Sequence, residues 1–296
     1  MQPGRISYKA CPLCGEEAIV DLSGCAKQVA GPINCTLAMS SCAVYYAIMA
    51  AADEPVAANA RCYRPVTILA PEGSVVNARH PAPVAHRIAV THRLCNALLG
   101  ALHQAAPDRI PAAYYGVSYV LTFQAIAADG DRKVLVEIEI GGSGGHPRAD
   151  GRSTYSSGMH NNANIPIEMI ESDTPVTIME YALAPGSGGE GRNRGGLGLR
   201  RAWRIDAETA TFTAQMDRFR FRPFGLSGGG SGGAGSLTLT RNGEVQPLHS
   251  KVSNMPLARG DIIRLQTSGG GGFGPPDERD ARALERDRAL GLVTKG

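Results

Sequence analysis

Glycine gathers in four clusters in the second half of the chain, and these clusters constrain the fold more than any other feature of the sequence. They cover residues 141–145, 186–198, 228–235 and 269–274. Glycine accounts for 37 of the 296 residues, against about 7% in typical proteins, and it does not recur at every third position, which excludes a collagen-like triple helix. Because glycine has no Cβ atom, its segments can turn tightly or approach another group closely. We therefore expect tight connections between strands, functional loops, or both. The run of Gly195 and Gly196 before Gly198, between two expected strands, suggests positive φ angles at Gly195 and Gly196.

Composition excludes several classes of protein. Hydrophobic residues make up 43% and charged residues 19% of the chain, which is too apolar for a disordered polymer. The formal net charge of +3 gives no reason to expect nucleic acid as a partner. The most apolar stretch, residues 36–52, is shorter than the ~20 residues that cross a membrane. With no apolar leader at the N-terminus, we expect a cytoplasmic protein with reduced thiols.

The composition and the hydrophobic pattern of the sequence change near residue 115. Residues 1–115 carry two helical patterns, at 36–52 and 84–104, each preceded by an extended stretch, and predict a mixed α and β part. Residues 116–296 predict a β-rich part with glycine-rich loops and a short exposed helix after residue 276. We expect an α+β fold with mixed and antiparallel sheets, in two parts or in one intertwined domain. The expected strands cover residues 18–22, 64–70, 117–127, 133–140, 176–183, 199–205, 210–216, 236–241 and 261–267.

Two short motifs suggest cofactor sites, and neither has the context that it needs. Cys11 and Cys14 have zinc-ligand spacing, but no second pair follows, so ordinary turn cysteines are favoured over a structural zinc or a redox pair. The run from Gly186 to Gly191 matches G-x-G-x-x-G, but the glycine-rich residues 192–198 cannot continue as the helix that a dinucleotide loop requires. A Walker loop is absent. We therefore expect no nucleotide site on this chain.

Charged residues next to the glycine clusters are the candidates for chemistry. Arg192 and Arg194 could offer guanidinium forks to a carboxylate or a phosphate. Glu168 and Glu171 are three residues apart and would share one side of a helical turn, where they could act as general base, hold a cation, or simply be solvated. The histidines are scattered and form no metal-ligand pattern, so each is expected in a loop or on the surface.

The glycine clusters and the residues around them resemble the hydantoinase B and 5-oxoprolinase family, in its C-terminal half. Seven segments occur in the family's order over nearly the whole chain. They are Asp21 to Asn34, Arg64 to Ser74, Pro81 to Val84, Asn164 to Glu171, Ser187 to Gly198, Arg222 to Leu226, and Gly260 to Arg279.

The resemblance implies a subunit of an ATP-dependent enzyme for cyclic amides such as 5-oxoproline or hydantoins. ATP would bind to a hydantoinase A-like partner, and a separate N-terminal hydantoinase B-like chain could supply the upstream region rich in His and Asp where the family's metal site is expected. The isolated chain is then expected to be inactive. The alternatives are a non-catalytic assembly module and part of a related ATP-dependent ketone carboxylase.

Within this interpretation we assign roles to residues near the glycine clusters. Glu168, Glu171 and Asp150 are the candidate catalytic carboxylates, which could also hold a divalent metal ion. No metal site can be derived from the sequence. The candidate residues for binding an anionic part of a small-molecule substrate are Arg192, Arg194, Ser187 and Asn164.

Overall fold

The computed structural model describes residues 5–7, 17–52, 57–127 and 130–293. The chain folds into two compact units, Met1–Pro111 and Ala112–Gly296. The units contain helices together with mixed and antiparallel sheets, so the α+β prediction is confirmed. Among the described residues, no helix is long and apolar enough to cross a membrane.

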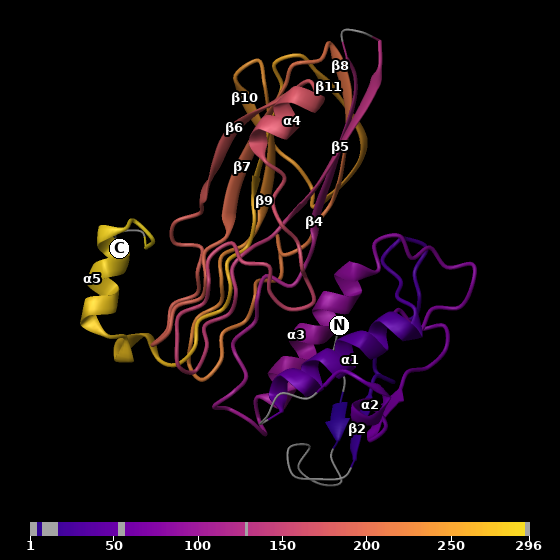
Figure 1. Ribbon diagram of the computed structural model, residues 1–296, viewed down its shortest axis with the longest axis vertical. Helices are drawn as coiled ribbons and strands as arrows, with labels where there is room; N and C mark the ends of the chain where they lie inside the picture. Colours follow the sequence, from indigo (N-terminus) through magenta and orange to yellow (C-terminus); the bar gives the residue numbers. More distant parts are fainter. Residues whose placement is uncertain (1–4, 8–16, 53–56, 128–129, 294–296) are drawn as a thin grey trace. The chain divides into compact units, whose positions relative to one another are not determined.

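The first unit consists of a small sheet and two paired helices (Figure 1). The strand β2 (Ala18–Asp21) pairs antiparallel with β1 (Arg5–Ser7) and parallel with β3 (Val66–Leu69). A parallel pair needs a long crossover, and here the crossover contains α1 (Leu37–Ala51) and the short α2 (Ala60–Tyr63).

Helix α1 packs against α3 (Ile88–Leu102). The Thr36 hydroxyl caps α1 by accepting a hydrogen bond from the Met39 amide. The buried face of α1 consists of small side chains such as Ala43 and Ala47, so a neighbouring helix can approach closely. The buried leucines of α3, including Leu94 and Leu98, provide the larger partners in this core.

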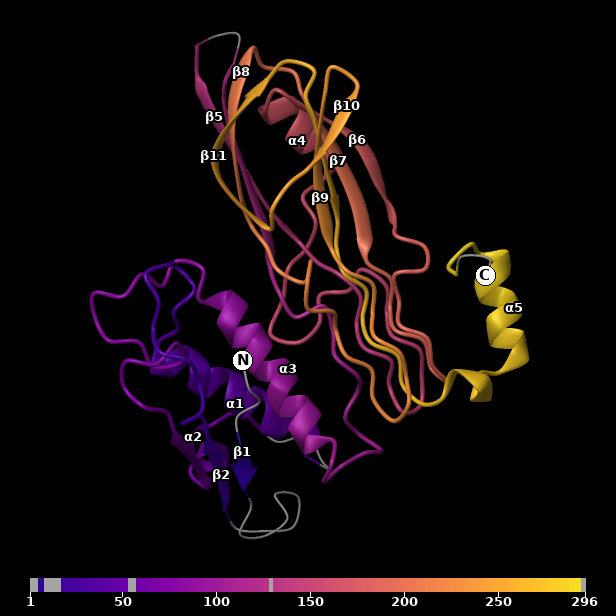
Figure 2. The same cartoon turned by 180° about the vertical axis from the view of Figure 1, so that it is seen from behind.

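The second unit is a sandwich of two antiparallel sheets (Figure 2). One sheet has the order β10-β9-β12-β7-β6 and the other β11-β8-β4-β5. Phe123 of β4 lies between Trp203 of β7 and Phe212 of β8, at ring-centroid distances of 5.7 and 5.0 Å, so aromatic rings join the two sheets at the centre of the core. The strands are β4 (Tyr119–Ile126), β5 (Arg132–Glu139), β6 (Val176–Leu183), β7 (Leu199–Ile205), β8 (Thr209–Gln215), β9 (Ser236–Arg241), β10 (Glu244–Pro247), β11 (Lys251–Ala258) and β12 (Ile262–Gln266).

Each strand and long helix expected from the sequence is present, and the sequence missed several short or irregular elements. The helix α4 (Ile167–Asp173) is only seven residues long, and β11 is interrupted by a register shift and contains Pro256. The C-terminal helix α5 (Ala281–Ala289) is largely exposed, but its Asp287 is fully buried, so the expectation of an exposed helix is only partly right.

The glycine clusters form extended segments that run side by side beyond the ends of the sandwich strands (Figure 1). In the segment 269–274, successive amides donate to different neighbours. The amide of Gly270 donates to the oxygen of Gly196, that of Gly271 to Ala113, and that of Gly272 to Gly230, at 2.8–2.9 Å. Successive amides thus point in different directions around the segment. This is typical of an extended chain with three residues per turn, which forms no hydrogen bonds within itself.

These segments touch through their backbones, and this contact explains the glycines. A Cβ atom built on Gly196 would lie 2.0 Å from the carbonyl oxygen of Arg152, and one on Gly195 would lie 2.0 Å from that of Gly270. The sequence suggested positive φ angles at Gly195 and Gly196, and this was wrong, because neither residue lies in the left-handed region. The constraint is the distance between backbones and not the local φ.

We expect Gly196→Ala to destabilise the second unit by about 3 kcal/mol or more, because the added methyl group must push two backbones apart. Thermal unfolding followed by circular dichroism measures the change. Gly230→Ala is the matched control, since its Cβ would meet its nearest atom, the Glu190 amide nitrogen, at an ordinary 3.4 Å. Equal melting temperatures for the two variants would show that the close contact is not required.

Candidate functional site

The candidate residues fall into two groups within the second unit. Asp150, Arg192, Arg194 and Ser187 lie in or beside the glycine segments, whereas Glu168 and Glu171 lie on α4, which Figure 1 places away from α5 and the segments next to it. The structure thus brings Asp150 and Arg194 together and keeps the two glutamates apart from them. The catalytic role of these carboxylates stays a prediction.

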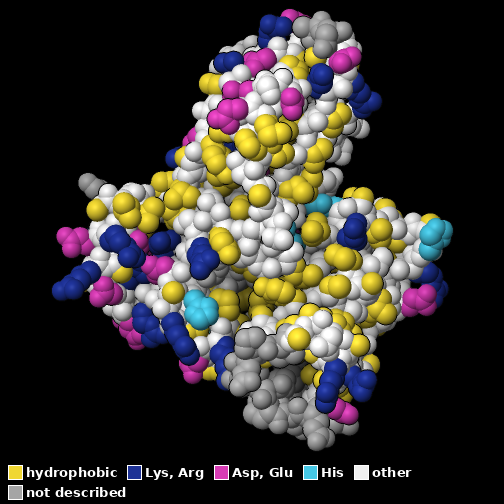
Figure 3. Space-filling view, viewed as in Figure 1, with side chains coloured by type: hydrophobic (Ala, Val, Ile, Leu, Met, Phe, Trp, Pro, Cys, Tyr) yellow, Lys and Arg dark blue, Asp and Glu magenta, His cyan; other side chains and the backbone are white. Residues whose placement is uncertain are grey.

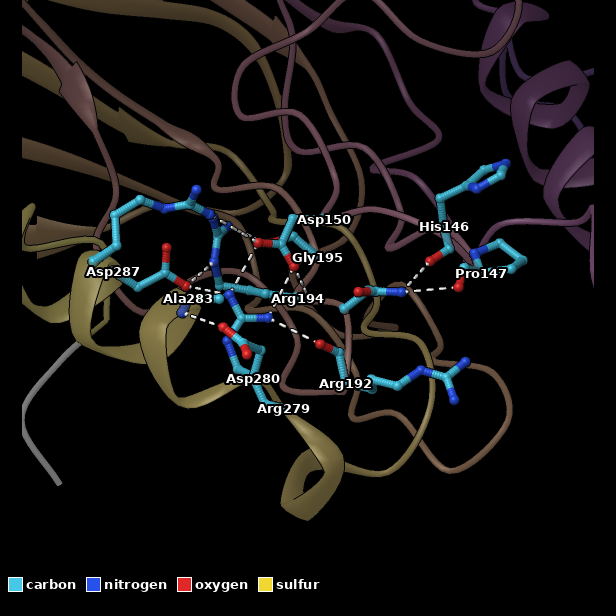
Figure 4. A network of polar contacts seen from close by, with 12 residues as sticks. His146, Pro147, Asp150, Arg192, Arg194, Gly195, Arg279, Asp280, Ala283 and Asp287 are labelled. Carbon is cyan, nitrogen blue, oxygen red and sulfur yellow. Dashed lines mark hydrogen bonds and ion pairs between the residues drawn. The ribbon is translucent and has the colours of Figure 1, made fainter.

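Asp150 and Arg194 belong to a buried ion network that includes the C-terminal helix (Figure 4). Asp150 accepts hydrogen bonds from the amide of Arg194 at 2.7 Å and from both terminal nitrogens of Arg279 at 2.8 and 2.9 Å. The Nε atom of Arg194 donates to Oδ2 of Asp287 at 3.0 Å, and Arg279 also donates to that oxygen. Two guanidinium groups and two carboxylates therefore bridge each other.

The charges in this network compensate one another. Burial alone would raise the pKa of Asp150, but the hydrogen bonds from Arg279 and from the Arg194 amide outweigh it and hold the pKa below its usual value. Arg194 uses Nε and Nη1 for Asp287 and for the carbonyl oxygen of Gly195. The arrangement fastens α5 to the glycine segments and engages the fork that an anionic substrate would need.

The remaining candidates make other contacts. Arg192 pairs on the surface with Glu278 at 3.1 Å. The Ser187 hydroxyl is buried, donates to the carbonyl oxygen of Ala184 at 2.6 Å and accepts from the Gly198 amide at 2.8 Å, which positions a connection in the glycine segment. Each of these groups already has a protein partner.

The glutamates on α4 differ in their contacts. Glu171 accepts a hydrogen bond from the Ile178 amide at 2.8 Å. Glu168 lies exposed in the first turn of α4, where a negative charge suits the helix dipole, and it has no partner among the described residues. Of the candidate carboxylates, Glu168 is therefore the most accessible to a ligand.

Between the two sheets lies a second ion network that sequence analysis missed. Arg201 of β7 is fully buried and lies 2.9 Å from Glu137 and 2.8 Å from Glu139, both on β5. Arg201 also donates to the side-chain oxygen of Asn164 at 2.8 Å, and the ring of Tyr181 lies 4.8 Å from its guanidinium carbon. Asn164, a candidate for substrate binding, thus contacts the arginine of this core network.

Two carboxylates share the single guanidinium of this core network. Burial raises the pKa of Glu139 to about 7, although Arg201 opposes the shift, and burial also raises the pKa of Glu137. Like charges held close together cannot both ionise easily. The pair therefore retains a proton up to a higher pH than exposed glutamates do.

A buried imidazole links two hydroxyl groups close to the start of β4. The Nδ1 atom of His160 lies 2.6 Å from the Tyr115 hydroxyl, and its Nε2 atom lies 2.5 Å from the Ser118 hydroxyl. Burial lowers the pKa of His160 to about 4 and raises that of Tyr115, so the ring is neutral at physiological pH. His160, like His86 and His92, is buried. His160 and His86 lie in a loop and a turn, which fits the expectation of a loop or surface position, whereas His92 is buried on α3, so the expectation is wrong for His92. A lone histidine has no spacing pattern that would have indicated its burial.

Within the described part of the chain, no group of three or more His, Cys, Asp or Glu side chains could hold a metal ion. Cys11 and Cys14, considered above as zinc ligands, lie outside the described residues. The divalent metal ion thus has no assigned ligands on the described residues of this chain.

Comparison with known proteins gives consistent matches over almost the whole chain. Residues 4–276 match the family model of hydantoinase B/oxoprolinase. An uncharacterized protein of Methanocaldococcus jannaschii is 34% identical, over 90% of this chain and 46% of its own length. The B subunit of a putative D-/L-hydantoinase from a Pseudomonas strain is 31% identical, over 95% of this chain and 48% of its own length. A 5-oxoprolinase of Dictyostelium discoideum is 30% identical, over 88% and 20%, respectively.

Two solved structures share the fold. An ATP-dependent caprolactamase from Pseudomonas jessenii superposes with a TM-score of 0.79 at 25% identity, over 94% of this chain and 49% of that one. An acetone carboxylase superposes with a TM-score of 0.84 at 15% identity, over 94% and 42%, and this second likeness concerns the fold alone. The chain spans about half the length of the first two relatives and of both structures.

We expect Asp287→Asn to release α5 from the glycine segments, because the guanidinium groups of Arg194 and Arg279 would lose the carboxylate that they share, and a broken buried ion pair costs about 3–5 kcal/mol. Hydrogen exchange of the α5 amides should become at least tenfold faster. Glu285→Gln, an exposed position on the same helix, is the control and should leave exchange unchanged. Unaltered exchange in Asp287→Asn would contradict the fastening role.

Proposed function

The chain belongs to the hydantoinase B/oxoprolinase family, and from this premise we propose that it forms the C-terminal half of a hydantoinase B-like subunit in an ATP-dependent enzyme that hydrolyses cyclic amides. The match of residues 4–276 to the family model carries this proposal. The similarity to a putative hydantoinase subunit and to an ATP-dependent caprolactamase supports the cyclic amide as the class of substrate.

The chemistry explains why such an enzyme would need ATP and more than one subunit. An unstrained cyclic amide is a poor electrophile, and phosphorylation of its oxygen by ATP makes the carbonyl carbon a better electrophile for water, so that the ring C–N bond can break. We assign ATP to a hydantoinase A-like partner and the metal ion, where one takes part, to an upstream hydantoinase B-like region. A carboxylase that activates its substrate in the same way is the alternative, and the fold shared with an acetone carboxylase makes it worth testing.

This chain would contribute a rigid frame and one free carboxylate. The bridged charges of Asp150, Arg194, Arg279 and Asp287 support a role in holding the glycine segments in place. The exposed carboxylate of Glu168 supports a role as general base or cation ligand in the assembled enzyme. If Glu168 has no such role, the chain is an assembly module without catalytic residues.

We expect the isolated chain not to bind ATP. In the G-x-G-x-x-G run the amide of Gly189 already donates to Gly270. No helix begins between this run and β7 at Leu199, so the run is not followed by the helix N-terminus that would hold a phosphate. Isothermal titration calorimetry measures binding, with the complex containing the A-like subunit as positive control. A dissociation constant in the low micromolar range for the chain alone would refute the expectation.

A reconstituted complex of this chain with an A-like subunit and an upstream B-like chain tests the function itself. We expect ATP hydrolysis to depend on 5-oxoproline or a hydantoin, and acetone with bicarbonate is the parallel assay for the carboxylase. Glu168→Gln should lower kcat at least tenfold with little change in the melting temperature, since Glu168 makes no hydrogen bond or ion pair with the described residues and the variant loses only a weak interaction with the helix dipole. Glu171→Gln should change turnover less, because its amide oxygen can still accept from Ile178.

Glu244→Gln, an exposed change on β10, is the control for this assay. If Glu168→Gln turns over at the wild-type rate in a complex that is active, the catalytic assignment is wrong and the assembly role is favoured. If no substrate of either class stimulates ATP hydrolysis by the complex, the proposed activity is wrong.

A further inference from the structure

The strand β5 turns three branched apolar side chains to the solvent, and two glutamates to the core beside Leu135. Val134, Val136 and Ile138 have exposed fractions of 51, 48 and 45%, whereas Glu137 and Glu139 are buried against Arg201. A strand at the surface of an antiparallel sheet normally shows the opposite pattern. An exposed row of branched apolar side chains is typical of a surface that binds another protein.

The neighbouring strands extend this row into an uncharged area. Val120, Thr122 and Gln124 of β4 lie opposite Ile138, Val136 and Val134. The next strand, β8, places Gln215, Thr213 and Thr211 opposite the same residues of β4. Interface cores are depleted of charge in the same way. In the view of Figure 3, hydrophobic side chains are also exposed in the region of α4 and β6, below a tip where charged side chains gather.

The strand is also an open edge. β5 lies at one end of its sheet, and the described residues include no backbone hydrogen bond from 132–139 to any segment other than β4. Such an edge can pair with a strand of another chain unless it is short, bulged, or blocked by proline or by charged side chains. Because β5 carries Lys133 and the inward-pointing Glu137 and Glu139, a strand that pairs with it must match these charges.

The other sheet edges carry these protective features. β11 has a register shift between Val252 and Met255 and contains Pro256. β10 is four residues long and ends in Pro247, and β6 has a register shift after Ile178. Among the described strands of the sandwich, β5 is the edge that combines eight regular residues with an absence of proline.

The order of charges along β5 favours a second copy of the same strand. The sequence begins with Arg132 and Lys133 and ends with Glu137 and Glu139. If two copies run antiparallel about a twofold axis at Val136, Lys133 of each lies opposite Glu139 of the other, and Val134 lies opposite Ile138. Glu139 already shares the guanidinium of Arg201 with Glu137, so Lys133 would add a second positive charge for the two carboxylates. Opposite charges and branched apolar residues directly across from each other both stabilise a strand pair. A parallel arrangement would place like charges side by side.

We propose that β5 is a dimerisation strand, through which two copies of this chain pair antiparallel about Val136 and join their four-stranded sheets into one. The interface is isologous, as in most homodimers. Its affinity comes from main-chain hydrogen bonds at the edge, and its register is set by the side chains of Val134, Val136 and Ile138.

Light scattering after size-exclusion chromatography tests the proposal on the intact chain. The wild type should have a molar mass of twice 31.1 kDa. Val136→Lys and Val136→Glu should each elute as monomers, with dimerisation weakened at least tenfold, because two like charges would meet at the twofold axis. An equimolar mixture of the two variants should restore the dimer, since Lys then faces Glu.

Thr122→Lys is the matched control. Thr122 lies opposite Val136 on the same face, but one strand away from the edge, so the variant should remain dimeric. Melting temperatures of all variants check that each is folded. A monomeric wild type, a mixture that stays monomeric, or loss of the dimer in Thr122→Lys would each overturn the proposal, the last because it would assign the contact to the sheet face.

Discussion

Close contact between glycine backbones is the constraint on which the second unit depends. The four glycine segments come from distant parts of the sequence, and each is continuous with strands of the sandwich. A Cβ atom built on Gly270 would lie 1.9 Å from the carbonyl oxygen of Ser143. No residue other than glycine fits at this position. Because the glycines of these segments have no side chains to bury, their order depends largely on hydrogen bonds between backbones. The segments thereby fix which strand lies beside which.

The buried charges follow from the same architecture. Glycine segments supply little apolar surface, and the unit is fastened by ion networks at two places, around Asp150 with Asp287 and around Arg201. A buried ion pair contributes little net stability compared with apolar packing, but the loss of one member leaves an uncompensated charge. Such networks therefore select one arrangement of the segments more strongly than they stabilise it. In this respect they complement the glycine contacts, which exclude alternatives by sterics.

The sequence predicted the long elements well, because α3 and β4 have clear helical and alternating patterns. It also identified the glycine clusters, but it grouped Asp150 and Arg194 with Glu168 and Glu171, which the structure places apart from them. It could not identify the partners Arg279 and Asp287, which lie more than 80 residues further along the chain from Arg194, in a C-terminal stretch that was expected to be an exposed helix. The positive φ angles suggested for Gly195 and Gly196 were wrong, because sequence shows local conformation and not the distance to another segment. His160 was missed since a single histidine carries no spacing signal.

The apolar surface of β5 and the ion network in the core are two consequences of one alternation. Side chains of a strand point to opposite faces at every step, so turning Glu137 and Glu139 toward Arg201 forces Val134, Val136 and Ile138 outward. A shift by one residue would bury the apolar row, but it would leave Arg201 without carboxylates inside a closed core, which is the costlier outcome. The burial of Arg201 on β7 thus determines which side chains of the edge strand β5, in the opposite sheet, are exposed to solvent. A chain whose core requires this inversion exposes an apolar edge strand, which either stays in contact with solvent or binds another chain.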